Sequence, residues 1–190
     1  MDLDPAVVRA AETCCGRPLE ARVSQEILPW EFDLIARVCG DTRYHDVTVF
    51  VFRDDEVALI HKRSEPAGAY WAPAGGLESG ETMVDAVRRE AREETGLDVE
   101  VERYALRLKA LFTSEGRERP WTSHVFLARY RSGDLDPIDR YEVESATWCT
   151  LARFRDAVAP VLRATGWGRY AYRLHMTSLL FPDLGVTAAR

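Results

Sequence analysis

Residues 75–97 read GGLESGETMVDAVRREAREETGL, a stretch in which glycines and charged residues stand at fixed spacings. The positions that set the spacing are Gly75, Glu81, Arg89, Glu90, Glu93, Glu94 and Gly96. Each of these residue types makes up roughly 5–8% of an average sequence, so the whole set rarely arises from composition alone. This stretch therefore carries the strongest indication of both fold and function.

A helix is predicted inside it. Thr82 followed three residues later by Asp85 has the form of a capping box at a helix start. Gly96 suits the left-handed residue that ends a helix. These signals predict a helix over residues 82–95.

Three carboxylates are predicted to share one face of this helix. At about 100° per residue, Glu90, Glu93 and Glu94 fall within an arc of roughly 100°. The adjoining apolar stripe consists of Val84, Val87 and Ala91. Like charges three and four residues apart destabilise a helix, so a cation is expected to compensate them.

Two kinds of cation could do so. Arg88, Arg89 and Arg92 are close in sequence, and a solvated, salt-bridged helix would use them. A hard divalent cation, Mg²⁺ or Mn²⁺, would use the same carboxylates, because these ions prefer oxygen ligands and bind phosphates at their remaining positions. A metal there would orient a diphosphate and lower the pKa of a water that attacks phosphorus.

The whole spacing resembles the Nudix box: Gly, five residues, Glu, seven residues, Arg-Glu, two residues, Glu-Glu, one residue, Gly and an apolar residue. Two positions depart from the usual pattern. Ala91 stands where the family prefers Ile, Leu or Val, and Ala74 precedes the box where many relatives carry Gly. The resemblance implies the α/β/α Nudix fold and hydrolysis of a phosphoanhydride bond.

The resemblance also implies roles for individual residues. The metal ligands would be Glu90, Glu93, Glu94 and the backbone carbonyl of Ala74. Arg89 and Glu81 would hold the ligating carboxylates in orientation, a role whose loss typically costs about 10–100-fold in metal affinity or activity.

The general base is less closely specified. In the family it is a box glutamate, here Glu90 or Glu93, or an acid supplied by a later loop. Glu142 and Glu144 are the candidates for the later acid, and we include Glu144 among the predicted catalytic residues. The alternative for both is an exposed charge, since acids are mostly solvated.

The substrate is predicted to be a small nucleotide. Phosphate could be contacted by Lys62, Arg63, Arg107 or Lys109, and a base could stack on Tyr70, Trp71, Phe112 or Trp121. Exposed strand charges and core aromatics are the alternatives. Phe112 stands where ADP-ribose hydrolases of the family carry proline, and the tyrosine typical of dinucleoside polyphosphate hydrolases is absent. Nucleoside triphosphates and other nucleoside diphosphate derivatives are therefore favoured.

Two other functions stay open. A Nudix-fold regulatory module would bind a nucleotide without turnover, although such a module need not keep all of these acids. Residues 13–19, TCCGRPL, resemble the cysteine segment of isopentenyl diphosphate isomerase, but they precede the first core strand instead of following it. A short motif in the wrong context carries a high false-positive risk.

Composition fits one enzyme domain with extensions. The chain has 190 residues and a formal net charge of −6, which argues against duplex nucleic acid as the main partner. Its four cysteines lack zinc spacing and the density of a disulfide scaffold, so a reducing cytoplasm is expected. The four histidines show no metal-ligand spacing. Neither a signal peptide nor an apolar stretch of about 18 residues is evident, so no membrane contact is expected.

Strands are predicted on both sides of the helix. Residues 45–53 alternate on two apolar faces, and residues 56–63 form their hairpin partner. A half-buried strand follows at 97–101, two more at 106–113 and 121–131 flank a charged turn at 114–120, and a short one holds 146–149. This order predicts an α/β sandwich with a mixed central sheet.

The two ends are predicted to be helical extensions of a core at residues 43–152. Residues 1–42 hold helices at 5–12 and about 30–38, separated by irregular sequence. Residues 153–190 hold a helix that Pro160 kinks or shortens, a turn at 166–168 and a last helix at 169–181. Such extensions commonly cap a core, shape a pocket or form a homodimer surface, and all three stay open.

Overall fold

A computed structural model describes residues 3–40 and 43–186 of the chain. Its strands are β1 (Leu19–Glu26), β2 (His45–Arg53), β3 (Glu56–Lys62), β4 (Ala74–Gly75), β5 (Asp98–Ser114), β6 (Arg117–Ser132) and β7 (Val143–Thr150). They form one mixed sheet in the order β1-β5-β6-β2-β3-β7, with β4 beside β2. The pairs β1–β5 and β2–β6 are parallel, and the other pairs are antiparallel.

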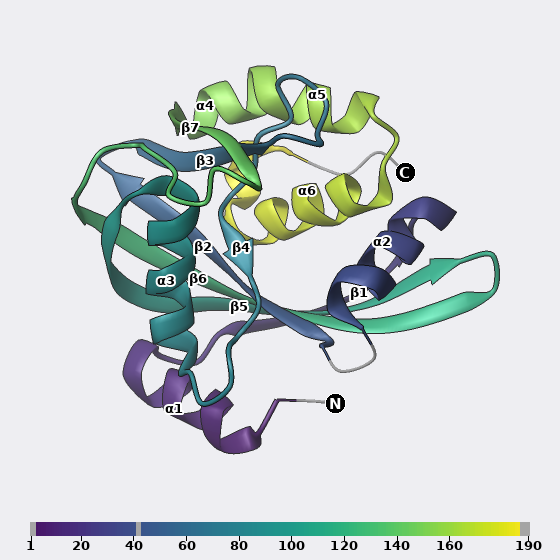
Figure 1. The fold of residues 1–190 in the computed structure, drawn as a ribbon, viewed down its shortest axis with the longest axis horizontal. Helices are drawn as coiled ribbons and strands as arrows, with labels where there is room; N and C mark the ends of the chain where they lie inside the picture. The colour runs from purple at the N-terminus through teal and green to yellow at the C-terminus, as the bar shows by residue number, and fades with distance from the viewer. Residues whose placement is uncertain (1–2, 41–42, 187–190) are drawn as a thin grey trace.

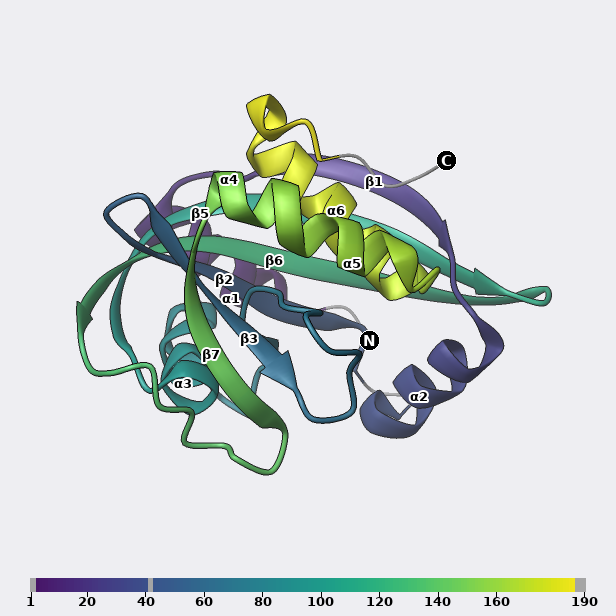
Figure 2. The same cartoon turned by 90° about the horizontal axis from the view of Figure 1, so that it is seen from above.

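Helices cover both faces of this sheet (Figure 1). They are α1 (Pro5–Cys15), α2 (Pro29–Cys39), α3 (Met83–Thr95), α4 (Leu151–Arg153), the π-helical turn η1 (Phe154–Val158), α5 (Ala159–Ala164), α6 (Gly168–Leu180) and the 3₁₀ turn η2 (Pro182–Leu184). Helices α1 and α3 lie on one face, and α5 and α6 cross the other (Figure 2). The predicted α/β sandwich with a mixed central sheet is confirmed.

Strand β2 contributes to two hydrophobic cores, one on each face. Val47, Val49 and Val51 pack with α1 and α3, whereas Phe50 and Phe52 pack with the C-terminal helices. Successive side chains of a strand point to opposite faces, which explains the near-continuous apolar run of this strand. The strand is thus covered on both sides, as its sequence predicted.

Helix α3 begins and ends as predicted. The Thr82 hydroxyl accepts a hydrogen bond from the Asp85 backbone N–H at 3.1 Å, and Gly96 takes a left-handed conformation with φ of 81°. Ala91, the residue that departs from the family preference, is fully buried on the helix face toward the sheet. A small side chain there lets the helix approach the sheet closely, so the departure is a packing adjustment.

The predicted division of β5 and β6 is wrong in two places. Residues 97–101 and 106–113 belong to one long strand with irregular register, and the charged turn predicted at 114–120 is only two residues long. Glu115 and Gly116 both have positive φ, 49° and 77°, which allows a tight hairpin turn. Beyond that turn Arg119 is buried and donates hydrogen bonds to the carbonyls of Gly40 and Arg43, so charged residues continue the strand.

The segment predicted as irregular between α1 and α2 is strand β1, which pairs in parallel with β5 at the sheet edge. Ala21 and Val23 alternate toward the core while the residues between them are exposed. The prediction failed because one apolar row on an edge strand is a weak signal. The proposed division of the chain at about residues 42 and 152 stays a prediction.

The C-terminal helices follow the predicted order. Residues 151–164 are helical throughout, and the π-helical turn η1 ends at Val158, two residues before Pro160. The Ala159 N–H bonds to the Phe154 carbonyl, one residue farther back than in an α-helix. Because proline lacks an N–H, the wider turn lets the chain pass Pro160 without a break.

Glu31 joins α2 to α6 and is fully buried. Its carboxylate accepts backbone N–H bonds from Leu28 at 2.9 Å, Gly168 at 2.9 Å and Arg169 at 3.0 Å, so it caps the N-terminus of α6. A buried donor that loses its partner costs about 1–3 kcal/mol. The Glu31→Ala variant is therefore expected to lose about 2–4 kcal/mol of unfolding free energy in urea.

The exposed neighbour Glu26 provides a matched control. The Glu26→Ala variant is expected to stay within about 0.5 kcal/mol of the parent protein. An unchanged unfolding free energy for Glu31→Ala would show that α6 holds its place without this cap.

Candidate active site

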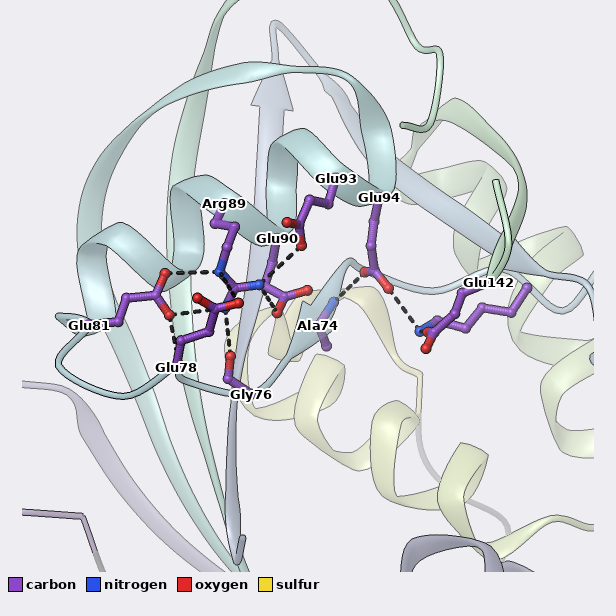
Figure 3. Close-up of polar contacts among 10 residues, drawn as sticks. Ala74, Gly76, Glu78, Glu81, Arg89, Glu90, Glu93, Glu94 and Glu142 are labelled. Atoms are coloured by element: carbon purple, nitrogen blue, oxygen red, sulfur yellow. Dashed lines mark hydrogen bonds and ion pairs between the residues drawn. The ribbon is translucent and has the colours of Figure 1, made fainter. Parts of the chain in front are cut away.

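Arg89 lies at the centre of a cluster of acidic side chains (Figure 3). Its guanidinium donates to both carboxylate oxygens of Glu81, at 2.9 and 3.0 Å, and to the Gly76 carbonyl at 2.7 Å. It also donates to Glu90 at 2.7 Å and to Glu93 at 3.1 Å. The planar, multi-donor guanidinium allows all of these contacts at once.

Glu81 fixes the orientation of Arg89 from the loop before α3. Burial raises the pKa of Glu81, but the hydrogen bonds from Arg89 and from the Glu78 backbone outweigh it, so the net shift is downward. The hydrogen bond to Glu81 is also the main cause that raises the pKa of Arg89. Both groups therefore stay charged near neutral pH.

Glu90 lies in surroundings that disfavour its negative charge. Its side chain is 10% exposed, and burial together with the negative charge of Glu94 raises its pKa to about 7, although Arg89 opposes the shift. The carboxylate lies directly against Gly75, where an added Cβ would be 2.0 Å from a Glu90 oxygen. Only glycine at position 75 leaves room for this carboxylate.

Glu94 is buried on the side of α3 that faces β3 and β4. It accepts the Ala74 backbone N–H at 2.8 Å and pairs with Lys62 at 2.8 Å. Lys62 also pairs with Glu142 at 2.6 Å, which links α3 to the segment before β7. Burial raises the pKa of Glu94, and Lys62 provides the largest opposing effect.

The carboxylates supply hard oxygen donors of the kind that Mg²⁺ or Mn²⁺ prefers. Among the residues that the structure describes, no three acidic, histidine or cysteine side chains converge as a ready metal site. In the structure, the positive charges of Arg89 and Lys62 balance the acidic side chains. The carboxylates nevertheless fit a divalent cation. Glu90 and Glu94 repel each other, and a bound cation would offset this repulsion.

A cavity of about 590 Å³ opens beside this cluster. Ala74, Gly75, Lys62 and Glu142 line the end nearest the acidic residues, and α2 and α6 form two of the walls. Ligand sites of small molecules commonly have volumes of about 300–1,000 Å³. The acidic cluster and the cavity therefore form one composite site.

A sequence profile of the NUDIX domain matches residues 42–167 of this chain. The chain belongs to the NUDIX family. The resemblance of residues 75–97 to the Nudix box is thereby confirmed.

Curated relatives extend this finding. The chain is 33% identical over 139 residues to the NAD-capped RNA hydrolase NudC of Photobacterium profundum, covering 68% of this chain and 47% of that protein. It is 39% identical over 108 residues to the human 8-oxo-dGDP phosphatase NUDT18, covering 55% of this chain and 31% of that protein. The chain thus spans about half or less of the length of these relatives.

A solved structure supports the fold. A NUDIX hydrolase from Nitrosomonas europaea aligns with a TM-score of 0.52 and 19% identity, covering 77% of this chain and 92% of that chain. None of the helices in the described ranges is long and apolar enough to cross a membrane.

The structure places the predicted Nudix-box residues together, but not every predicted site residue joins them. Glu144 pairs with His61 at 3.2 Å, whereas Glu142 reaches the cluster through Lys62. The role of Glu144 as a base stays a prediction, and its placement favours Glu142 as the later acid. The Ala74 carbonyl also stays a predicted ligand.

Half of the predicted substrate contacts line the cavity, namely Lys62, Arg63, Phe112 and Trp121. Arg107 lies elsewhere, because it pairs with Glu12 and Glu20 beneath α1. Trp71 is buried in the core beside Tyr170, where it supports the cavity wall from behind. Lys109 and Tyr70 do not belong to the lining, and Cys14 and Cys15 of the isomerase-like segment end α1 on the other face of the sheet.

Several cavity residues of this Nudix protein were not predicted, among them Arg43, Asp46 and Arg173. Asp46 could have been noticed in the sequence, because it is an acidic residue within a strand that is mostly apolar. Arg43 and Arg173 could not, because surface and cavity arginines look alike in a sequence.

The raised pKa of Glu90 predicts how stability depends on pH in the presence of a chelator. The folded protein binds this proton more tightly than the unfolded chain, whose ordinary pKa is 4.5. The contribution of Glu90 to stability is therefore largest below about pH 4.5 and is lost as pH rises through about 7. With EDTA at pH 8, the Glu90→Gln variant is expected to be more stable than the parent by on the order of 1–3 kcal/mol.

Urea unfolding at pH 5 and pH 8 would measure this difference. Glu100, a half-exposed acid that pairs with Arg129 and Arg131, provides the control, and Glu100→Gln is expected to show no gain at pH 8. A Glu90→Gln variant less stable than the parent at pH 8 would mean that the Arg89 ion pair outweighs burial.

Proposed function

We propose that this protein is a metal-dependent hydrolase that cleaves a phosphoanhydride bond in a nucleoside triphosphate or another nucleoside diphosphate derivative. The observation that carries the proposal is the Arg89-centred carboxylate cluster at one end of a ligand-sized cavity. The names of the relatives support it, since an NAD cap and 8-oxo-dGDP both contain a diphosphate joined to a nucleoside.

Glu90, Glu93, Glu94 and the Ala74 carbonyl would hold Mg²⁺ or Mn²⁺. When bound, such an ion neutralises charge on phosphate oxygens and lowers the pKa of a coordinated water. Arg89, itself held by Glu81, keeps Glu90 and Glu93 in position. Loss of such supporting contacts usually costs about 10–100-fold in activity.

Glu93 is the best-placed proton acceptor of the box. Its side chain is 45% exposed and has a single contact with Arg89, whereas Glu90 and Glu94 are buried. An accessible carboxylate can accept a proton from an attacking water and pass it to solvent. Lys62, which lies between Glu94 and Glu142 at the cavity edge, would donate to a phosphate oxygen of the substrate.

A substrate screen tests the proposal. Nucleoside triphosphates, oxidised nucleotides, NAD, nucleotide sugars, ADP-ribose and dinucleoside polyphosphates would be incubated with Mg²⁺ or Mn²⁺, and the products identified by mass. Hydrolysis that stops on addition of EDTA is expected. Isotopic oxygen from water would identify the phosphorus that is attacked.

A readout independent of turnover tests the metal site. Mg²⁺ is expected to raise the unfolding temperature of the parent protein more than that of Glu94→Gln, because a ligand that binds only the folded state stabilises it. Equal shifts would place the metal elsewhere.

The alternatives predict other outcomes of the same screen. Nucleotide binding without turnover would favour a regulatory module, and rearrangement of isopentenyl diphosphate would favour the isomerase. The cytoplasmic location and a homodimer stay predictions, to be tested by fractionation and by light scattering.

A further inference from the structure

The cavity next to the acidic cluster has apolar and aromatic lining residues that a diphosphate alone would not contact. Its inner surface includes Phe112 and Trp121 from the β5–β6 hairpin and Tyr172 and Met176 from α6. Side chains of α2, among them Leu34 and Val38, also line the cavity. A flat, mainly apolar ring system suits this lining.

Among the charged residues of the lining, Asp46 has an unsatisfied carboxylate oxygen. The Oδ1 atom of Asp46 is buried and has no hydrogen-bond partner among the described residues. Tyr172, which also lines the cavity, does not donate a hydrogen bond to Asp46, because its hydroxyl donates to Ser123 at 2.9 Å. A buried acceptor without a partner costs free energy, and a bound ligand with a polar edge would remove that cost.

The charges around Asp46 come from several elements. Burial raises the pKa of Asp46, while the nearby polar side chains of Ser123 and Trp121 and the positive charges of Arg173 and Arg43 oppose the shift. Arg43 itself lies against the box, since an added Cβ on Gly76 would be 2.5 Å from its guanidinium. The lining holds the basic residues Arg37, Arg43, Lys62, Arg63, Arg169 and Arg173 and the acidic residues Asp46, Glu65 and Glu142. This excess of basic groups favours an anionic ligand.

Arg173 is the basic residue best placed to bind that ligand. Its guanidinium stacks over the Trp71 ring at 4.8 Å from the centroid, and no side-chain hydrogen bond or ion pair joins it to another described residue. Its positive charge lowers the pKa of both Glu94 and Asp46, so it lies near both carboxylates. It belongs to α6, outside the residues that the NUDIX profile matches.

We infer that the cavity between α2 and α6 binds the nucleoside part of the substrate, with a polar edge of the base on Asp46 and the adjoining phosphate on Arg173. This inference rests on the proposed function, because it places the scissile diphosphate at the Arg89 cluster. It assigns substrate choice to β2 and α6, whereas the box supplies the reaction that all substrates share. An aliphatic group would leave Asp46 without a partner, whereas the polar edge of a heterocyclic base would supply one.

Binding of nucleoside monophosphates in EDTA tests this inference without any hydrolysis. Calorimetry would compare the four common monophosphates, the corresponding nucleosides and methylene diphosphonate. The parent protein is expected to prefer one base over the others by about tenfold or more, and Asp46→Asn to remove that preference. Arg173→Gln is expected to lower the affinity for every monophosphate by about tenfold and to leave the affinity for the free nucleosides unchanged.

Matched controls are Asp134→Asn and Arg153→Gln, which make the same chemical changes at exposed positions outside the cavity lining. Arg173 is only half-buried, so its variant keeps the test valid if Asp46→Asn fails to fold. Monophosphates that bind both variants as tightly as the parent would overturn the inference. Because no turnover is measured, that result would leave the hydrolase proposal standing.

Discussion

Glu93→Gln is expected to lower kcat by about 10²–10⁴-fold at saturating Mg²⁺, because it removes both a proton acceptor and a metal ligand. The loss should not come from unfolding. Glu93 has one ion pair, with Arg89, and its side chain is 45% exposed, so its charge contributes little to stability. Steady-state kinetics on a substrate from the screen, together with urea unfolding, would separate the two effects.

Glu100→Gln is the matched control, since Glu100 is also a half-exposed acid paired with arginine but lies on β5 away from the cluster. Its kcat is expected to stay unchanged. Full activity of Glu93→Gln would contradict the proposed mechanism, and a comparable loss in Glu142→Gln would indicate that the later acid is the base.

Arg89→Ala is expected to lose both stability and activity. The variant removes all five hydrogen bonds of the guanidinium and leaves Glu81 and Glu90 without a compensating charge. Breaking a buried ion pair in this way typically costs about 3–5 kcal/mol. Arg89→Lys keeps the charge but not the planar set of donors, so it is expected to fold and to lose about 10–100-fold in kcat.

Arg88→Lys makes the same change on the neighbouring residue, which is 55% exposed and lies 3.7 Å from Asp85. It is expected to leave kcat and unfolding free energy unchanged. Full activity in Arg89→Lys would show that only the charge of Arg89 matters, not its geometry.

The helix and the strands with strong periodicity could be predicted from the sequence. Thr82 and Gly96 bound α3 because caps act through local hydrogen bonds and a single left-handed residue. Strand β1 and the tight turn at Glu115 could not be predicted from the sequence. Their conformations depend on the partner strand and on α2 packed nearby. Tertiary contacts overrode local preference there.

The acidic cluster could be predicted for the same reason as α3. Glu81, Arg89, Glu90 and Glu93 lie close in sequence, and helical spacing alone gathers three of them. Asp46 and Arg173 are 127 positions apart and are brought into one cavity lining only by the sheet and α6. The different partners of Glu142 and Glu144 could not be predicted either. Glu142 pairs with Lys62 and Glu144 with His61, and this depends on how β3 and β7 align.

The contacts of Arg89 lie within residues 76–93, a short span of chain. Closing a short loop costs less chain entropy than closing a long one, so this cluster can assemble early during folding. The cavity closes only when residues near both ends of the chain have met. The two halves of the composite site are therefore expected to form at different stages of folding, the carboxylate cluster before the cavity.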